Sequence, residues 1–291
     1  MSAGTSVPSP GLLSDGVLAA SLTQGNLVPV SHATPSRPPL DLDALRSRLT
    51  GTPWRVEVSA ESPSTNADVL ARAGEEPGLV LLTEHQTAGR GRLGRTWVTP
   101  ARSALTFSVL VRAEVPLGRW PWLPLVTGSA VADALRGTAE VPATLKWPND
   151  VLVGERKVAG ILVELADTAA GPAAVVGVGL NTTLTQDELP VPTATSLALE
   201  GAATTDRTLL AAEVLLALVR HLDVWRAGGS PRAAYLGYAA TVGRRVAVDL
   251  PGGARVEGHA VDVDDDGRLL VDDGTTVHAL GAGDVVHVRA G

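Results

Sequence analysis

A loop with three regularly spaced arginines gives the most specific chemical signal in the chain. It runs Gly89-Arg90-Gly91-Arg92-Leu93-Gly94-Arg95, which has the G-x-G-x-x-G form of a dinucleotide-binding turn. Such a turn follows a strand and opens a helix, whereas here Pro100 and a strand-like run over 104–112 come next. We therefore exclude a dinucleotide-binding fold. We expect a flexible loop that brings three guanidinium groups to a phosphate or carboxylate, with which arginine forms bidentate contacts.

The chain has only two lysines, Lys146 and Lys157, against twenty-two arginines. Residues with AT-rich codons are depleted, so a lysine that serves only as a solvated charge would drift to arginine. A retained lysine more often supplies a compact, rotatable point charge. Taken singly, each lysine would be interpreted as an exposed charge at a strand end. Together they flank a predicted turn at Val153–Gly154, and a hairpin there would aim both ammonium groups near one site.

Two lysines and three arginines around one site suit a reaction that joins two anions. An example is a carboxylate that attacks the α-phosphate of ATP. Like charges must approach each other in this reaction, and further negative charge develops at phosphorus. Preorganised cations offset this repulsion, and one electrostatic donor is typically worth a factor of about 10²–10³ in rate.

Polar side chains near these cations have two interpretations each. Ser64-Thr65-Asn66 stands at a predicted helix start, where it either caps the helix or grips a polar head group. Gln86, just before the arginine loop, is similarly ambiguous. Trp97 either stacks on a base or anchors the loop in the core.

The elements that position these residues are predicted to form a mixed α/β core. Continuous apolar runs predict buried strands, and helical periodicity with polar starts predicts helices. Core strands are expected at 55–59, 78–83, 104–112, 151–154, 158–165 and 173–180, and helices at 40–49, 64–73, 124–135, 208–225 and 232–239. After Gly243, a small all-β module is expected, with strands at 245–249, 255–263, 268–271, 276–280 and 285–289.

The composition predicts the domain organisation and limits the class of protein. We expect a disordered or loosely ordered tail over 1–42, a catalytic domain over 43–240 and the β module over 241–291. The net charge of −7, without a basic stripe, gives no sign of a nucleic-acid partner. Cysteine is absent, which excludes disulfides and thiolate metal sites. His85 has no second histidine at ligand spacing, so no metal site made of protein groups alone is expected. Neither a membrane span nor a secretion signal is recognisable, and we expect a cytoplasmic protein.

Six motifs in order along the chain resemble the biotin–protein ligase family. They are Ser64-Thr-Asn66, Glu84-His-Gln86, Gly89-Arg-Gly-Arg-Leu-Gly-Arg-Thr-Trp97, Lys146-Trp-Pro-Asn-Asp150, Arg156-Lys-Val-Ala-Gly-Ile-Leu-Val-Glu164 and Gly177-Val-Gly-Leu-Asn181. The resemblance covers about residues 54–290. It implies an α+β fold: a class II aminoacyl-tRNA synthetase-like catalytic domain, with a mixed sheet flanked by helices, and a small C-terminal SH3-like β-barrel.

The resemblance also implies a reaction and its residues. Biotin and ATP, with Mg²⁺, would give biotinyl-5′-AMP, and the biotinyl group would pass to a lysine of a carboxylase biotin carrier domain. The implied catalytic residues are Lys157, Arg92 and Lys146. The implied biotin-binding residues are Ser64, Thr65, Asn66, Gln86, Arg90, Gly91, Arg92 and Lys157. The implied ATP and adenylate residues are Gly89, Arg95, Trp97, Lys146, Asn149 and Asn181. No metal ligand comes from the protein alone, and Mg²⁺ would arrive with ATP.

Two departures from the family pattern bear on the function. Pro63 precedes the Ser-Thr-Asn run, where the family more often has a short polar or acidic residue. The polar tail stands where repressor members carry a DNA-binding domain, so we expect a monofunctional ligase. A lipoate–protein ligase on the same fold and a non-catalytic biotin-sensing co-repressor remain alternatives. The sequence leaves the oligomeric state open.

Overall fold

The computed structural model describes residues 37–288. Most of the tail expected over 1–42 therefore lies outside the described residues. The core of the fold is a seven-stranded mixed sheet in the order β1-β2-β5-β9-β8-β7-β6. Only the β1–β2 pair in this sheet is parallel. The strands are β1 (Arg55–Ser59), β2 (Leu79–Thr83), β5 (Ala104–Val111), β6 (Ala143–Lys146), β7 (Asp150–Val153), β8 (Arg156–Thr168) and β9 (Gly171–Asn181).

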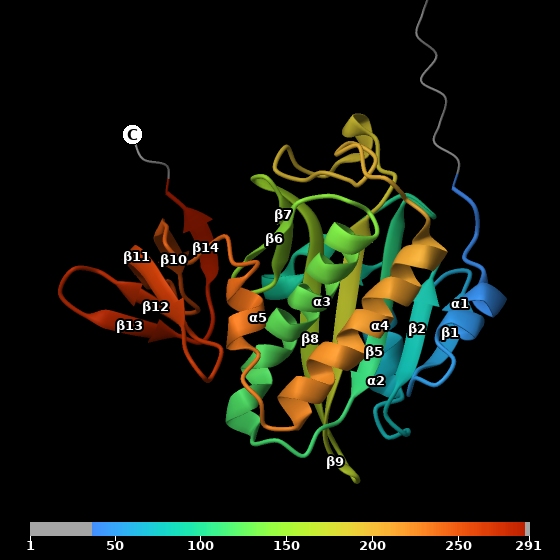
Figure 1. Cartoon of the computed structure of the whole chain (residues 1–291), viewed down its shortest axis with the longest axis horizontal. Helices are drawn as coiled ribbons and strands as arrows, with labels where there is room; N and C mark the ends of the chain where they lie inside the picture. The colour runs from blue at the N-terminus through green and yellow to red at the C-terminus, as the bar shows by residue number, and fades with distance from the viewer. Residues whose placement is uncertain (1–36, 289–291) are drawn as a thin grey trace, which may run out of the picture. The chain divides into compact units, whose positions relative to one another are not determined.

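Helices cover the two faces of this sheet unequally. The long helices α3 (Leu123–Gly137) and α4 (Arg207–Arg226) lie across the face turned toward the viewer in Figure 1. The short helix α2 (Thr65–Ala71) packs against β2, β5 and β9 on the other face. Two further helices are α1 (Leu42–Arg48), which packs on α4 and β1, and α5 (Arg232–Leu236), which packs on α3.

The sheet has an apolar core on each face because successive strand residues point in opposite directions. On β2, Val80 and Leu82 join the large core beneath α3 and α4, whereas Leu79 and Leu81 join a smaller core beneath α2. The smaller core covers only part of its face. The candidate site lies beyond it, on the same face.

The C-terminal residues form a second, five-stranded antiparallel sheet in the order β13-β12-β11-β10-β14. Its strands are β10 (Arg245–Asp249), β11 (Arg255–Val263), β12 (Leu269–Asp272), β13 (Val277–Leu280) and β14 (Asp284–His287). Two tryptophans outside this sheet form hydrogen bonds with the loop between β11 and β12. The Trp122 indole N–H donates to the Asp265 carbonyl (2.7 Å), and the Trp147 indole N–H donates to the Gly267 carbonyl (3.1 Å). The predicted fold class, a mixed sheet with flanking helices and a small C-terminal β domain of SH3-like type, is confirmed.

The structure adds short elements that the sequence did not predict. β6 was not predicted, because its four residues include only one β-branched side chain, Thr144. The arginine loop is a small two-stranded hairpin, β3 (Gly89–Arg90) and β4 (Thr96–Trp97), around the 3₁₀ turn η1 (Arg92–Gly94). Two other 3₁₀ turns are η2 (Leu117–Trp122) and η3 (Gln186–Glu188).

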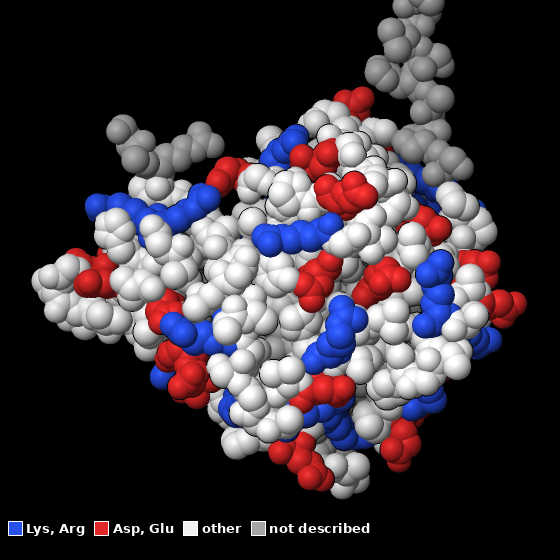
Figure 2. Space-filling model, viewed as in Figure 1, with Lys and Arg blue, Asp and Glu red and all other residues white. Residues whose placement is uncertain are grey.

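The described surface agrees with the scattered charge of the sequence. On the face shown in Figure 2, basic and acidic side chains alternate over the described residues. Among residues 37–288, no helix is both long and apolar enough to cross a membrane.

Candidate functional site

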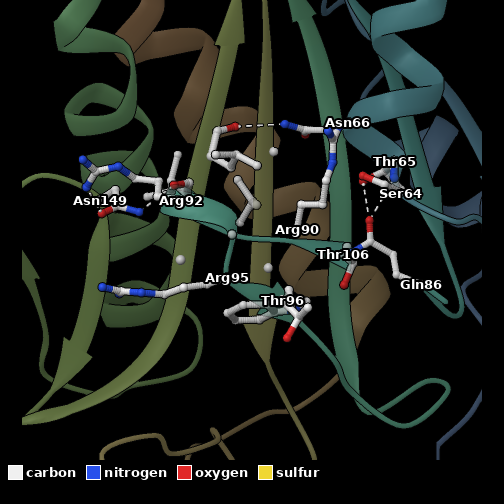
Figure 3. A pocket seen from close by; sticks show the side chains of 18 of the residues that line it. Ser64, Thr65, Asn66, Gln86, Arg90, Arg92, Arg95, Thr96, Thr106 and Asn149 are labelled. Carbon is white, nitrogen blue, oxygen red and sulfur yellow. Dashed lines mark hydrogen bonds between the residues drawn. The ribbon is translucent and has the colours of Figure 1, made fainter. Parts of the chain in front are cut away.

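A cavity of about 120 Å³ lies on the α2 face of the large sheet, beneath the arginine hairpin. Figure 3 shows Ser64, Thr65 and Gln86 at one end and Arg92, Arg95 and Asn149 toward the other. The residues lining it are Ser64, Thr65, Asn66, Gln86, Arg90, Gly91, Arg92, Leu93, Arg95, Thr96, Trp97, Thr106, Phe107, Asn149, Asp150, Lys157, Gly160, Ile161, Leu162, Gly177, Val178, Gly179 and Asp284.

The start of α2 supplies the polar end of the cavity. Ser64 is the N-cap, and its hydroxyl accepts from the Ala67 N–H (3.4 Å). The Gln86 amide oxygen accepts from the Thr65 N–H (2.8 Å) and lies 3.1 Å from the Thr65 hydroxyl. The helix cap therefore explains the position of the Ser64 hydroxyl. Thr65 and Gln86 are hydrogen-bonded to each other at the end of the cavity.

Two glycines of β9 make room above the sheet for side chains from elsewhere. A Cβ built on Gly177 would lie 2.1 Å from Asn66 Oδ1, and one built on Gly179 would lie 2.6 Å from Cε2 of the Trp97 indole. Gly177 and Gly179 are two residues apart on β9, so both face the same side of the sheet. Glycine inside a strand marks such close approaches. The Gly177-Val-Gly179 motif thus seats Asn66 and Trp97 on the floor of the site.

Each arginine of the hairpin contacts a different element. Arg90 Nη2 lies 3.4 Å from the Glu164 carboxylate on β8. Arg92 Nη1 donates to Asn149 Oδ1 (3.0 Å) and lies 3.4 Å from the Gly283 carbonyl. Arg95 forms an ion pair with Asp284 at the start of β14. The C-terminal sheet therefore contributes directly to the position of the hairpin.

Burial changes the electrostatics of this arginine cluster. The pKa of the Arg92 guanidinium is lowered from its ordinary value, chiefly because burial disfavours its charge, and the Asp150 carboxylate opposes that change. A partly desolvated guanidinium attracts an incoming anion more strongly than one in bulk water.

Both lysines lie near the carboxylate of Asp150. Lys157 Nζ is 2.5 Å from Asp150 Oδ1 and 5.9 Å from the centroid of the Trp97 ring. Lys146 stands opposite Asp150 in the β6–β7 register. Burial lowers the pKa of Lys146, Asp150 opposes this change, and the charge of Lys157 adds to it. The two ammonium groups are therefore close enough for each to act on the site around Asp150.

The structure brings most of the expected site residues together. Eleven of them line the cavity: Ser64, Thr65, Asn66, Gln86, Arg90, Gly91, Arg92, Arg95, Trp97, Asn149 and Lys157. Lys146 lies beside it, in a neighbouring crevice with Asn149 and Asp150. Asn181 is buried outside it and donates from Nδ2 to the Thr195 carbonyl (2.9 Å).

Gly89 also lies outside the cavity lining, at the base of the hairpin. A Cβ there would lie 2.4 Å from the Trp97 carbonyl oxygen and 2.7 Å from Gln86 Nε2. Because Gly89 has no side chain, β3 and β4 can pair directly beside Gln86.

Several lining residues were given no role from the sequence, although Asp150 and three of the glycines stand in the six motifs. Thr106, Asp150, Gly160, Gly177, Gly179 and Asp284 all line the cavity. The glycines inside predicted strands were a usable signal. Asp284 had none, because it follows the arginine hairpin by about 190 residues and meets it only in the folded chain. Among residues 37–288, no group of three or more His, Asp or Glu side chains is placed to hold a metal ion.

Comparisons with known proteins agree with this geometry. The Biotin/lipoate A/B protein ligase family matches residues 58–181, and the Biotin protein ligase C terminal domain matches residues 241–288. The biotin–acetyl-CoA-carboxylase ligase of Mycobacterium tuberculosis is 47% identical over 264 residues, which cover 87% of this chain and 97% of that protein.

Solved structures show the same relationship. A point mutant of the Aquifex aeolicus biotin protein ligase in complex with biotin superposes with a TM-score of 0.70, at 26% identity, over 82% of this chain and 100% of that one. The Aquifex aeolicus enzyme in complex with biotin and ATP gives 0.68 at 28% identity, over 81% and 99%. With fold, motifs and relatives in agreement, the chain belongs to the biotin protein ligase family.

Proposed function

We propose that this chain activates biotin with ATP and transfers it to a lysine of a biotin carrier domain in an acyl-CoA carboxylase. The observation that carries the proposal is the convergence, in one cavity, of three hairpin arginines and Lys157 with the polar groups of Thr65, Asn66 and Gln86. The cations suit two anionic reactants, and the polar end suits a buried neutral head group.

In the first step, a biotin carboxylate oxygen attacks the α-phosphorus of ATP. A new P–O bond forms, the bond to the β-phosphate bridging oxygen breaks, and pyrophosphate leaves. Lys157 would bridge the carboxylate and the α-phosphate. Arg90, Gly91 and Arg92 would fold over both groups. These positive groups are already in place when the reaction begins, so they stabilise the negative charge that develops at the phosphorus in the transition state.

In the second step, the neutral amine of the carrier lysine attacks the acyl carbon of biotinyl-5′-AMP. An amide bond forms as the acyl C–O bond to the phosphate oxygen breaks, AMP leaves with that oxygen, and the amine releases a proton to solvent. The nucleotide side of the site would be made by Arg95, Trp97, Lys146 and Asn149, whereas Gly89 and Asn181 lie outside the cavity lining. Mg²⁺ would arrive with ATP and neutralise its phosphates.

The cavity beneath the hairpin has a volume of about 120 Å³, below the roughly 300–1,000 Å³ typical of small-molecule sites. A second hollow of about 500 Å³ adjoins it and shares Arg90, Arg92 and Arg95 with its lining, so a shift of side chains between the two would make room for both substrates. The Trp97 indole lies on the floor at Gly179, and its Nε1 is buried without a hydrogen-bond partner among the described residues. We expect the indole to leave this position when both substrates bind.

The polar end of the cavity distinguishes biotin from lipoate. The ureido ring of biotin can pair with Thr65 and Gln86, whereas the dithiolane ring of lipoate has no N–H or C=O group. A site built for hydrogen bonds rejects an analogue that leaves its buried polar groups unpaired, often by about 10⁴-fold or more. Ser64, Thr65, Asn66 and Gln86 would therefore bind the head of biotin.

ATP–pyrophosphate exchange tests this proposal. Purified protein is incubated with Mg·ATP and labelled pyrophosphate, with biotin, lipoate or no acid. We expect exchange that depends on biotin and stays at background with lipoate. Exchange with lipoate alone would overturn the choice of substrate, and no exchange with either acid would overturn the proposed first step.

A further inference from the structure

A continuous line of polar contacts crosses the floor of the site, from Gln86 to Arg90. The Thr65 and Ser108 hydroxyl oxygens are 2.7 Å apart, and Ser108 Oγ is 2.6 Å from Asn66 Oδ1. Asn66 Nδ2 donates to Glu164 Oε2 (2.8 Å), and Glu164 pairs with Arg90 at 3.4 Å. Two members of this line, Ser108 and Glu164, have no place in the function proposed above.

The sheet holds the central member of the line in one position. Ser108 on β5, Gly177 on β9 and Leu162 on β8 are paired neighbours across three strands. Asn66 lies over Gly177, with Oδ1 toward Ser108 and Nδ2 toward the Leu162 carbonyl (3.3 Å) and Glu164. Ser108 is fully buried and Asn66 is 4% exposed. Asn66 therefore bonds in a fixed position that bulk water does not reach.

Two acceptors, the Glu164 carboxylate (2.8 Å) and the Leu162 carbonyl (3.3 Å), fix the direction of the Asn66 amide, and the bond to Glu164 is the shorter of the two. The amide therefore turns Nδ2 toward these acceptors and Oδ1 toward Ser108. Ser108 has one proton, which it then donates to Asn66 Oδ1. The Ser108 oxygen is left to accept from Thr65, which is nearer to it than to Gln86 Oε1. Thr65 Oγ1 then offers lone pairs to a ligand, and Gln86 Nε2 offers N–H groups.

We propose that Glu164 is a positioning residue for biotin binding. Through Asn66 and Ser108 it sets the pattern of donors and acceptors that meets the ureido ring, and through Arg90 it holds the arginine hairpin over the cavity. The inference rests on the proposed function, since it assumes that biotin's head lies at Thr65 and Gln86.

Three variants separate the two effects of Glu164. Glu164→Gln keeps an oxygen that accepts from Asn66 but removes the charge that pairs with Arg90. Glu164→Leu removes both. Ser108→Ala breaks the line between Asn66 and Thr65 and leaves Arg90 paired. The matched control is Asp167→Asn, which changes an exposed carboxylate on the same strand, β8.

The readout is selectivity between biotin and 2-iminobiotin, which carries an N–H donor where biotin carries the ureido oxygen. The kcat/KM of biotin-dependent and 2-iminobiotin-dependent pyrophosphate exchange is measured for each variant. We expect the biotin preference to fall at least tenfold in Glu164→Leu and Ser108→Ala, and to stay within threefold of wild type in Glu164→Gln and Asp167→Asn. For Glu164→Gln we expect a raised KM for biotin with little change in kcat.

The outcomes distinguish this inference from the proposed function. If wild-type protein shows no biotin-dependent exchange, the proposed function fails and the inference falls with it. If wild type exchanges with biotin but Glu164→Leu and Ser108→Ala keep its selectivity, only the inference is wrong. A variant that loses activity through misfolding is recognised by its thermal unfolding, and the selectivity of the remaining folded variant then decides.

Discussion

Lys157 and Asp150 form an ion pair of 2.5 Å at the point where the hairpin arginines, the sheet floor and the second lysine meet. In the cavity as the structure shows it, the carboxylate of Asp150 stands where an anionic reactant would be attracted. A substrate carboxylate or phosphate that approaches Lys157 therefore competes with Asp150. The pair holds the ammonium group at the lining of the cavity.

Removing the Lys157 charge should slow the first step strongly without unfolding the protein. The side chain is about one-third exposed, so its loss costs little stability, whereas a preorganised electrostatic group is typically worth about 10²–10³ in rate. We expect Lys157→Ala to slow single-turnover formation of biotinyl-5′-AMP by at least about 100-fold, with a thermal unfolding midpoint close to that of wild type. Adenylation at the wild-type rate in this variant would remove Lys157 from its role.

The ion pair between Arg95 and Asp284 should restrain the arginine hairpin before substrates bind. Exposed ion pairs are worth about 1 kcal/mol or less, so Asp284→Ala should increase tryptic cleavage within residues 90–95 by no more than about fivefold. Biotin with ATP should protect the hairpin in both proteins, because the arginines then contact the substrates. Cleavage that is unchanged by ligands in wild type would show that the hairpin does not close over them.

Gly177 should be necessary for biotin binding because of what lies above it. An alanine Cβ there would overlap Asn66 Oδ1 at 2.1 Å, so Gly177→Ala must displace the amide. We expect the KM for biotin to rise at least tenfold. Gly137→Ala, where an added Cβ meets no atom within 4 Å, is the control and should leave KM unchanged. An unaltered KM in Gly177→Ala would mean that Asn66 does not contribute to biotin binding.

Lys146 should lower the free energy of unfolding of the protein, although we expect it to contribute to ATP binding. Burial lowers its pKa, so over the pH range between its folded and unfolded pKa values the unfolded chain binds more protons, and stability rises with pH there. Below that range the charged Lys146 carries its full cost in the folded state. We expect Lys146→Met to unfold at a higher temperature than wild type at pH 7, by a margin that shrinks toward pH 10, and to show a raised KM for ATP. A lower unfolding temperature at pH 7 would contradict the burial argument.

The sequence predicted the elements that have clear boundaries. The strands expected at 55–59 and 255–263 have the same bounds in the structure, and Ser64 caps α2 as expected. Turn residues and a side-chain cap are local signals, so neighbouring residues suffice to recognise them. β6 was missed because only Thr144 in it is β-branched and because it lies between Pro142 and Pro148, whereas the predicted four-residue strands are rich in valine or leucine.

The site was only partly predictable for a different physical reason. Residues that act by their own chemistry, such as Lys157 and the hairpin arginines, are recognisable by type and spacing. Glu164 and Asp284 act by what they touch. Their contacts join β8 and β14 to the hairpin, and such long-range pairs arise only when the chain folds.

The most direct test of the central claim is transfer of labelled biotin by the purified protein to a biotin carrier domain, with and without Mg·ATP. We expect label on the carrier lysine only when ATP is present, none when that lysine is replaced by arginine, and labelling slowed by at least about 100-fold when the ligase carries Lys157→Ala. Transfer that does not require ATP, or an unlabelled carrier in the complete reaction, would contradict it.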